Sequence, residues 1–124
     1  MNVVWWAGQV LVALIFLGAG INHSLGYERA SRNPMMAWMK ALPPSMVKTI
    51  GVLEILGAIG LIVPAATGIL PWLTPLAALL LGVVVALAFF FHLSRREYPN
   101  AAFNALLAVL AFAVAFGRFV VSPF

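Results

Sequence analysis

Four long apolar segments dominate the sequence, and they constrain the fold more than any other feature. They cover about residues 3–23, 47–66, 73–92 and 101–121. A helix needs about 20 apolar residues to cross a hydrocarbon core of about 30 Å, and in lipid its backbone groups must bond to one another. We therefore expect an all-α, membrane-embedded four-helix bundle that forms one transmembrane domain over residues 1–124.

Composition supports this and excludes several classes of protein. The chain is 65% hydrophobic and only 8% charged, too few charges to cover the surface of a soluble domain. The absence of cysteine excludes disulfides and thiolate chemistry. The net charge of +4 does not indicate a nucleic-acid partner, because the basic residues flank apolar segments as membrane topology requires.

The basic residues also predict an orientation. Six of the seven fall in or beside the first and third connections, which lie on the same side of a four-span bundle: Arg29, Arg32, Lys40, Lys48, Arg95 and Arg96. Only Arg118 belongs to the opposite side, where it is expected to extend toward the interface. The positive-inside rule then places both long connections in the cytoplasm of a cell-membrane protein and both termini outside.

The first connection is expected to contain a short helix. Asn33 and Pro34 are suited to an N-cap and a first turn, and the following residues 35–42 are apolar apart from one lysine. We expect this helix to lie in the inner membrane interface with Trp38. It is interpreted as a simple connector or, alternatively, as a lid over a site beneath it. Ser45 is the expected N-cap of the second span.

Glu54 is the main polar exception within the spans. A charged side chain at the centre of a bilayer costs roughly 2.5–3.5 kcal/mol on insertion scales. Its helical neighbours Gly51, Gly57 and Ala58 form a small-residue face, which allows close approach of another helix, so Glu54 is expected to point inward.

Other polar residues fall at a similar depth and define a candidate site in the cytoplasmic half. His23 and Asn22 end the first span, His92 ends the third, and Asn104 begins an alanine-lined face of the fourth. Glu54 and His92 are the candidate catalytic groups; His23, Asn22, Asn104 and Trp38 are the candidate ligand-binding residues. The alternative is that these residues only hold the helices together.

Several stretches resemble the DoxX-like family of four-helix membrane proteins. They are FLGAGINH (16–23), IGVLEILGAIGLIVP (50–64), ILPWLTPLAALLL (69–81) and FHLSRREYPNAAFNALLAVLAF (91–112). The resemblance implies a link to quinone-dependent redox enzymes. The wider fold is similar to that of emopamil-binding sterol isomerases and sigma-2 receptors, which hold lipophilic ligands between helices near acidic residues. By that likeness Glu54, His92 and Asn104 would line a pocket, but a shared fold does not transfer a reaction.

Three functions remain open. The first is binding, with or without catalysis, of a small lipophilic molecule such as a quinone or an isoprenoid-like lipid. The second is a non-catalytic membrane subunit whose basic connections dock a redox partner protein, and the third is a small proton-coupled transporter. No metal and no cofactor other than a quinone is expected, because the histidines have no ligand-spacing signature. Small-residue faces are compatible with a homo-oligomer.

Overall fold

The computed structural model describes residues 2–124, and it contains four helices of 22–24 residues that are long and apolar enough to cross a membrane. They are α1 (Asn2–His23), α3 (Pro44–Thr67), α4 (Leu73–Ser94) and α5 (Tyr98–Phe116), the last extended by a π-helical turn, η2 (Gly117–Val121). The first connection contains α2 (Tyr27–Ala30) and a 3-10 helix, η1 (Pro34–Ala41). The expected all-α membrane bundle is confirmed.

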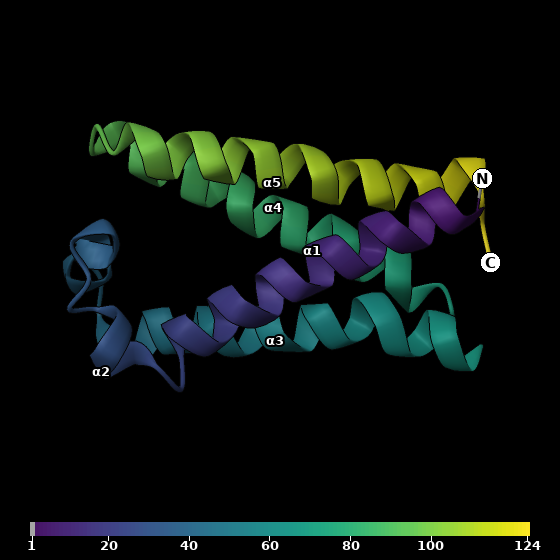
Figure 1. Ribbon diagram of the computed structural model, residues 1–124, viewed down its shortest axis with the longest axis horizontal. Helices are drawn as coiled ribbons and strands as arrows, with labels where there is room; N and C mark the ends of the chain where they lie inside the picture. Colours follow the sequence, from purple (N-terminus) through teal and green to yellow (C-terminus); the bar gives the residue numbers. More distant parts are fainter. Residues whose placement is uncertain (1) are drawn as a thin grey trace.

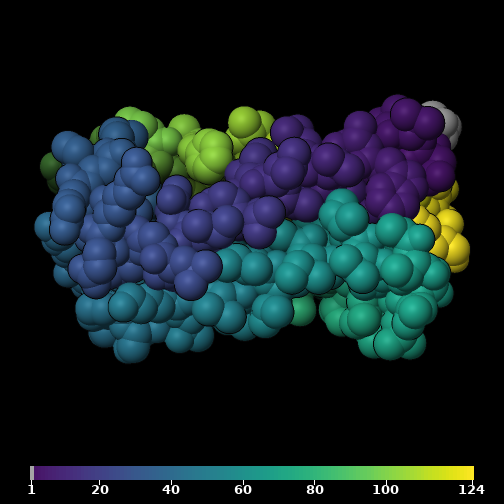
Figure 2. All heavy atoms as spheres, turned by 60° about the horizontal axis from the view of Figure 1, so that its bottom comes forward, coloured from purple at the N-terminus to yellow at the C-terminus, as the bar shows by residue number. Residues whose placement is uncertain are grey.

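The long helices pack as two layers, and each layer is a pair of antiparallel helices: α1 with α3, and α4 with α5 (Figure 1). α4 and α5 lie side by side, α1 crosses diagonally over the bundle, and α3 packs against both α1 and α4. In the space-filling view α1 lies directly on α3, and the first connection covers one end of the molecule (Figure 2). That end, where His23 and His92 finish their helices, is called the histidine end. The opposite end, with both chain termini and Arg118, is called the arginine end.

The core consists of small and aliphatic side chains from all four long helices. Its members are Val12, Ala13, Phe16, Ala58, Leu61, Ala78, Leu81, Val85, Leu107, Ala108, Ala111, Val114 and Ala115. Large apolar side chains such as Leu14, Leu56 and Leu87 instead face outward, each more than half exposed. Hydrocarbon rather than water would surround such a surface in a bilayer, so these side chains fit a membrane protein.

Two glycines set the crossing of α1 and α3. A Cβ atom on Gly20 would lie 2.6 Å from the carbonyl oxygen of Gly51, and one on Gly51 would lie 2.7 Å from that of Gly20. Only glycine at both positions allows this approach, which is the small-residue packing expected around Glu54. The close crossing brings the end of α1 against the polar side chain of α3.

A proline inside α3 is matched by a hydroxyl from α4. Pro64 has no N–H, so the carbonyl oxygen of Gly60 loses its usual helical donor. The Thr74 hydroxyl donates to that oxygen at 3.1 Å, and Thr74 is fully buried. A backbone group that would otherwise be unpaired in the membrane is thereby satisfied.

Of the two predicted helix N-caps, one is confirmed and one is wrong. Asn33 caps η1 as expected, since its Oδ1 accepts a hydrogen bond from the Met35 N–H at 2.9 Å. Ser45 is not the N-cap of α3: that helix begins at Pro44, and Pro43 occupies the cap position. The physical reason is that Pro44 suits the first position of a helix. Its ring fixes the φ angle there, and it has no N–H group that would need an acceptor.

Candidate functional site

The shortest polar contact between two side chains at the histidine end joins α1 to α3. His23 Nδ1 lies 2.6 Å from Glu54 Oε1, and their side chains are only 12% and 5% exposed. Glu54 is therefore an inward-facing carboxylate, as its small-residue neighbours predict. A short contact of this kind is typical of a charge-assisted hydrogen bond.

A second histidine–carboxylate pair follows at the end of α4. His92 Nδ1 lies 2.9 Å from Glu97 Oε1, and the same oxygen accepts from Arg95 Nε at 3.1 Å. Partial burial raises the pKa of Glu97, but the hydrogen bonds and charges of His92 and Arg95 outweigh this effect and hold the pKa below its usual value. The turn between α4 and α5 thus keeps an anionic group beside a buried imidazole.

Trp38 of η1 lies between the two histidines. Its ring is 5.2 Å from the His23 ring and 5.1 Å from the His92 ring, centroid to centroid, at interplanar angles of 78° and 88°. Both imidazoles therefore meet the indole edge to face. One flat ring separates two imidazole–carboxylate pairs that come from different helices.

The second ring nitrogen of each histidine has no partner in the part of the chain that the structure describes. In each pair Nδ1 faces a carboxylate, and neither Nε2 makes a hydrogen bond to any residue between 2 and 124. A neutral imidazole that donates its Nδ1–H to a carboxylate presents Nε2 as an acceptor, whereas a protonated ring presents it as a donor. Both rings can thus bond to a further group through Nε2.

The helix η1 covers this arrangement and is held at several points. The side chain of Asn100 on α5 donates to the Met35 carbonyl oxygen at 3.1 Å. Met39 on η1 is fully buried in a small apolar cluster with Tyr27 and Val47. These contacts anchor the segment that inserts Trp38, so η1 has the position of a lid over the histidine end.

The remaining predicted site residues lie apart from this centre. Asn104 donates to the Asn100 carbonyl oxygen one turn earlier on α5 and makes no hydrogen bond with Glu54 among the described residues. Asn22 is exposed and lines a pocket of about 300 Å³ with Arg29, Ala30, Asn33 and Met36. Glu54 bonds to His23 and not to His92, whose partner is Glu97.

Glu97 and Asn100 are site residues that the sequence analysis missed. Both follow the basic turn after α4, where polar residues are common and carry no periodic signal. The available signal was the spacing of His92 and Glu97 across a tight turn, which places the two side chains on one side of it. In residues 2–124 no three histidine, aspartate or glutamate side chains gather closely enough to hold a metal ion.

At the arginine end the structure corrects an expectation. Arg118 does not extend outward to the interface; it is 2% exposed and bonds to Gln9, Asn2 and Ser122. The reason is that α1 carries two amide side chains at this depth, so the guanidinium finds acceptors inside the bundle rather than in water.

Comparison with known proteins identifies the family of this chain. No curated protein and no solved structure is significantly similar to the sequence. The profile of the DoxX-like family matches residues 7–114, which include all of α3 and α4, most of α1 and α5, both histidine–carboxylate pairs and Trp38. This integral membrane protein therefore belongs to the DoxX-like family.

Proposed function

We propose that this protein binds a small lipophilic molecule, a quinone or an isoprenoid-like lipid, at the histidine end. The observation that carries the proposal is the indole of Trp38, held between two imidazoles whose Nε2 atoms bond to none of the described residues. A space that accepts an indole edge to face with two imidazoles would also accept a ring of similar size.

The chemistry of the two pairs suits a ring with oxygen substituents. Each Nε2 can donate to or accept from a carbonyl or hydroxyl group, depending on the protonation of its ring. Glu54 and Glu97 orient the imidazoles and would stabilise either one as an imidazolium. His23 and His92 could therefore pass a proton to or from a bound ligand. If the protein is an enzyme, His92 and Glu54 are its candidate acid–base groups, and Glu54 would act through its contact with His23.

Trp38 must move for such a ligand to bind. Neither of the pockets at the two ends is lined by Glu54 or His92, and the indole occupies the space between the imidazoles. We propose that η1 lifts as a lid, that the polar head of the ligand takes the place of the indole, and that Trp38 then packs over it. Asn22 and Asn104 would belong to the outer margin of that site.

The orientation that suits this function places the histidine end on the cytoplasmic side. Arg29, Arg32, Lys40, Lys48, Arg95 and Arg96 are all exposed there, as the positive-inside rule favours. Both termini would then be outside the cell membrane. A reporter fused to either terminus and tested for protease access in intact cells would check this orientation.

Ligand binding is tested with the purified protein in lipid nanodiscs. A short-chain benzoquinone and a short isoprenoid alcohol are titrated separately, and co-extracted lipids are identified by mass spectrometry. We expect saturable binding of one of these probes that falls at least tenfold in Glu54→Gln and in His92→Phe, since loss of one hydrogen bond to a charged group costs about 1.5–3 kcal/mol. Glu28→Gln is the matched control, because Glu28 is exposed and its carboxylate bonds to no described residue. Equal affinities in all four proteins would contradict the proposal.

A second candidate function rests on the same six exposed basic side chains. They form a positive surface around η1, and such a surface favours docking of an acidic soluble protein. The protein would then be a membrane subunit that assists a redox enzyme. Mild crosslinking in native membranes, compared between the wild type and an Arg95→Gln/Arg96→Gln variant, tests this role. A partner captured equally by both proteins would count against it.

A further inference from the structure

The arginine end contains a buried cation that the histidine-end site does not use. Arg118 lies on the π-helical turn η2 and is one of the largest fully enclosed side chains. Its Nε donates to Gln9 Oε1, and its Nη1 donates to Asn2 Oδ1 at 2.7 Å and to the Ser122 carbonyl oxygen at 3.0 Å. Gln9 in turn donates through Nε2 to the Leu61 carbonyl oxygen at 2.9 Å. These contacts tie α1, α3 and η2 together.

No carboxylate side chain neutralises this cation. Glu28, Glu54 and Glu97 are the three acidic residues of the chain, and all lie in or near the histidine end. Every described hydrogen-bond acceptor of Arg118 is a neutral oxygen, and the rings of Trp6 and Phe124 beside the guanidinium carry no formal charge. An arginine keeps its charge in a protein, and an enclosed charge without a counter-ion is costly. The site therefore favours an added anion.

Two buried donors at this end also have no acceptor. Arg118 Nη2 is enclosed and has no hydrogen-bond partner among residues 2–124, and the same holds for Trp5 Nε1. The Trp5 ring packs directly on Gly117, which precedes Arg118, and a Cβ there would collide with it. Buried N–H groups are nearly always paired, so the unpaired Nη2 of Arg118 indicates that an added acceptor completes the site.

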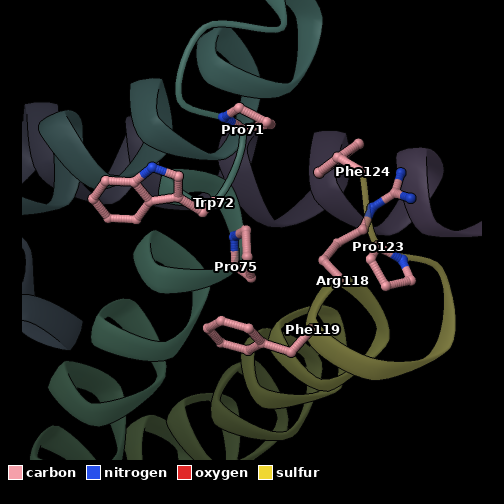
Figure 3. A pocket seen from close by; sticks show the side chains of 7 residues that line it. All are labelled: Pro71, Trp72, Pro75, Arg118, Phe119, Pro123 and Phe124. Atoms are coloured by element: carbon pink, nitrogen blue, oxygen red, sulfur yellow. The ribbon is translucent and has the colours of Figure 1, made fainter.

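A pocket of about 230 Å³ is lined by Arg118. Figure 3 shows its two walls. Pro71 and Trp72 come from the connection before α4 and Pro75 from its first turn, whereas Phe119, Pro123 and Phe124 come from η2 and the residues after it. The walls are apolar except for the guanidinium. Phe124 lies over that group, with its ring centroid 4.2 Å from Cζ. A pocket with one cation and rigid apolar walls suits an amphiphile better than a free inorganic ion.

We propose that this pocket binds the oxyanion of a membrane amphiphile, a phosphate or carboxylate headgroup. The oxyanion accepts from Arg118 Nη2 after the Phe124 ring turns aside, and the adjoining hydrocarbon lies against the proline and aromatic walls. An anion bound here neutralises the buried charge and supplies the missing acceptor. The site is separate from the histidine end, so its failure would not affect the proposed quinone-like ligand.

Native mass spectrometry of the full chain in detergent tests this site. The protein is incubated with equal amounts of phosphatidylglycerol and phosphatidylcholine, then in separate arms with oleate and with inorganic phosphate. We expect at least tenfold preference for an anionic amphiphile, either phosphatidylglycerol or oleate, since hydrogen bonds to charged groups contribute about 1.5–3 kcal/mol. The two amphiphile arms distinguish a phosphate from a carboxylate headgroup.

Three variants complete the test. Arg118→Gln should abolish the preference, whereas Arg96→Gln, which removes an exposed cation at the other end, should preserve it. Because Arg118→Gln also breaks contacts between helices, Phe119→Glu provides a second route: this exposed position lines the pocket without bonding to Arg118, and its carboxylate should displace an anion. Three results would each overturn the proposal: retention of phosphatidylglycerol and of oleate no stronger than that of phosphatidylcholine, binding of inorganic phosphate alone, or an unchanged preference in Phe119→Glu.

Discussion

His23 Nδ1 and Glu54 Oε1 lie 2.6 Å apart, and this contact connects the last turn of α1 to the half of α3 nearer the histidine end. It depends on the crossing of Gly20 and Gly51, one turn away on each helix. The pair is therefore a product of backbone packing as much as of polar attraction. In the proposed function it holds one of two imidazoles in position for a ligand.

Gly51→Ala should separate α1 from α3. The new methyl group would meet the Gly20 carbonyl oxygen at 2.7 Å and the His23 Cβ at 2.9 Å, so the helices must shift. We expect a loss of about 1–3 kcal/mol in the free energy of unfolding, the usual cost of overpacking. Thermal unfolding in detergent measures the change. Gly18→Ala is the control: nothing lies within 4 Å of its added Cβ, so stability should stay the same or rise slightly.

Asn100→Ala should loosen the lid. The Asn100 side chain bonds to the Met35 carbonyl oxygen, so its loss releases one contact between η1 and α5. One such hydrogen bond contributes about 0.5–1.5 kcal/mol, which predicts roughly two- to tenfold faster amide exchange across Pro34–Ala41. Hydrogen–deuterium exchange with mass spectrometry reports this directly. Asn104→Ala removes only a bond within α5, and faster exchange of η1 in that variant would contradict the assignment.

The Glu97 carboxylate should contribute a pH-dependent part of the stability. Its pKa in the folded protein lies below the ordinary value of 4.5, so its contribution is complete above pH 4.5 and is lost as the pH falls through the lower folded-state pKa. Glu97→Gln should lower the unfolding free energy by about 1 kcal/mol at neutral pH, because the acceptor is partly exposed. The difference in Tm between this variant and the wild type should shrink below pH 4.5. A constant difference would show that the charge of Glu97 does not matter.

Much of the fold could be predicted from the sequence because each span carries its own signal. Hydrophobic length gave the four helices, and Gly51, Gly57 and Ala58 indicated that Glu54 faces inward. The Asn33–Pro34 pair placed the start of η1 within one residue. These features depend on neighbours close in the chain, so no knowledge of helix packing was needed.

The pairing of polar groups could not be predicted in the same way. The partner of His92 is Glu97, which is fixed by the geometry of the turn after α4, and that geometry includes a positive φ of 58° at Arg96. The burial of Arg118 depends on Gln9 and Asn2, which lie more than 100 positions away. Contacts between residues so far apart in the sequence depend on how the helices cross. The pattern of hydrophobic residues does not encode that crossing.

The most direct test of the histidine-end site uses the two histidines of the chain, which give two sets of imidazole ¹⁵N signals. The protein, labelled at histidine and held in nanodiscs, is titrated with a short-chain benzoquinone and separately with a short isoprenoid alcohol, and both Nε2 resonances are followed. We predict saturable shifts of both Nε2 signals with one shared affinity for the ligand that binds, and a weaker affinity in Glu54→Gln. Unchanged Nε2 signals at saturating concentrations of both ligands would contradict a ligand site between His23 and His92.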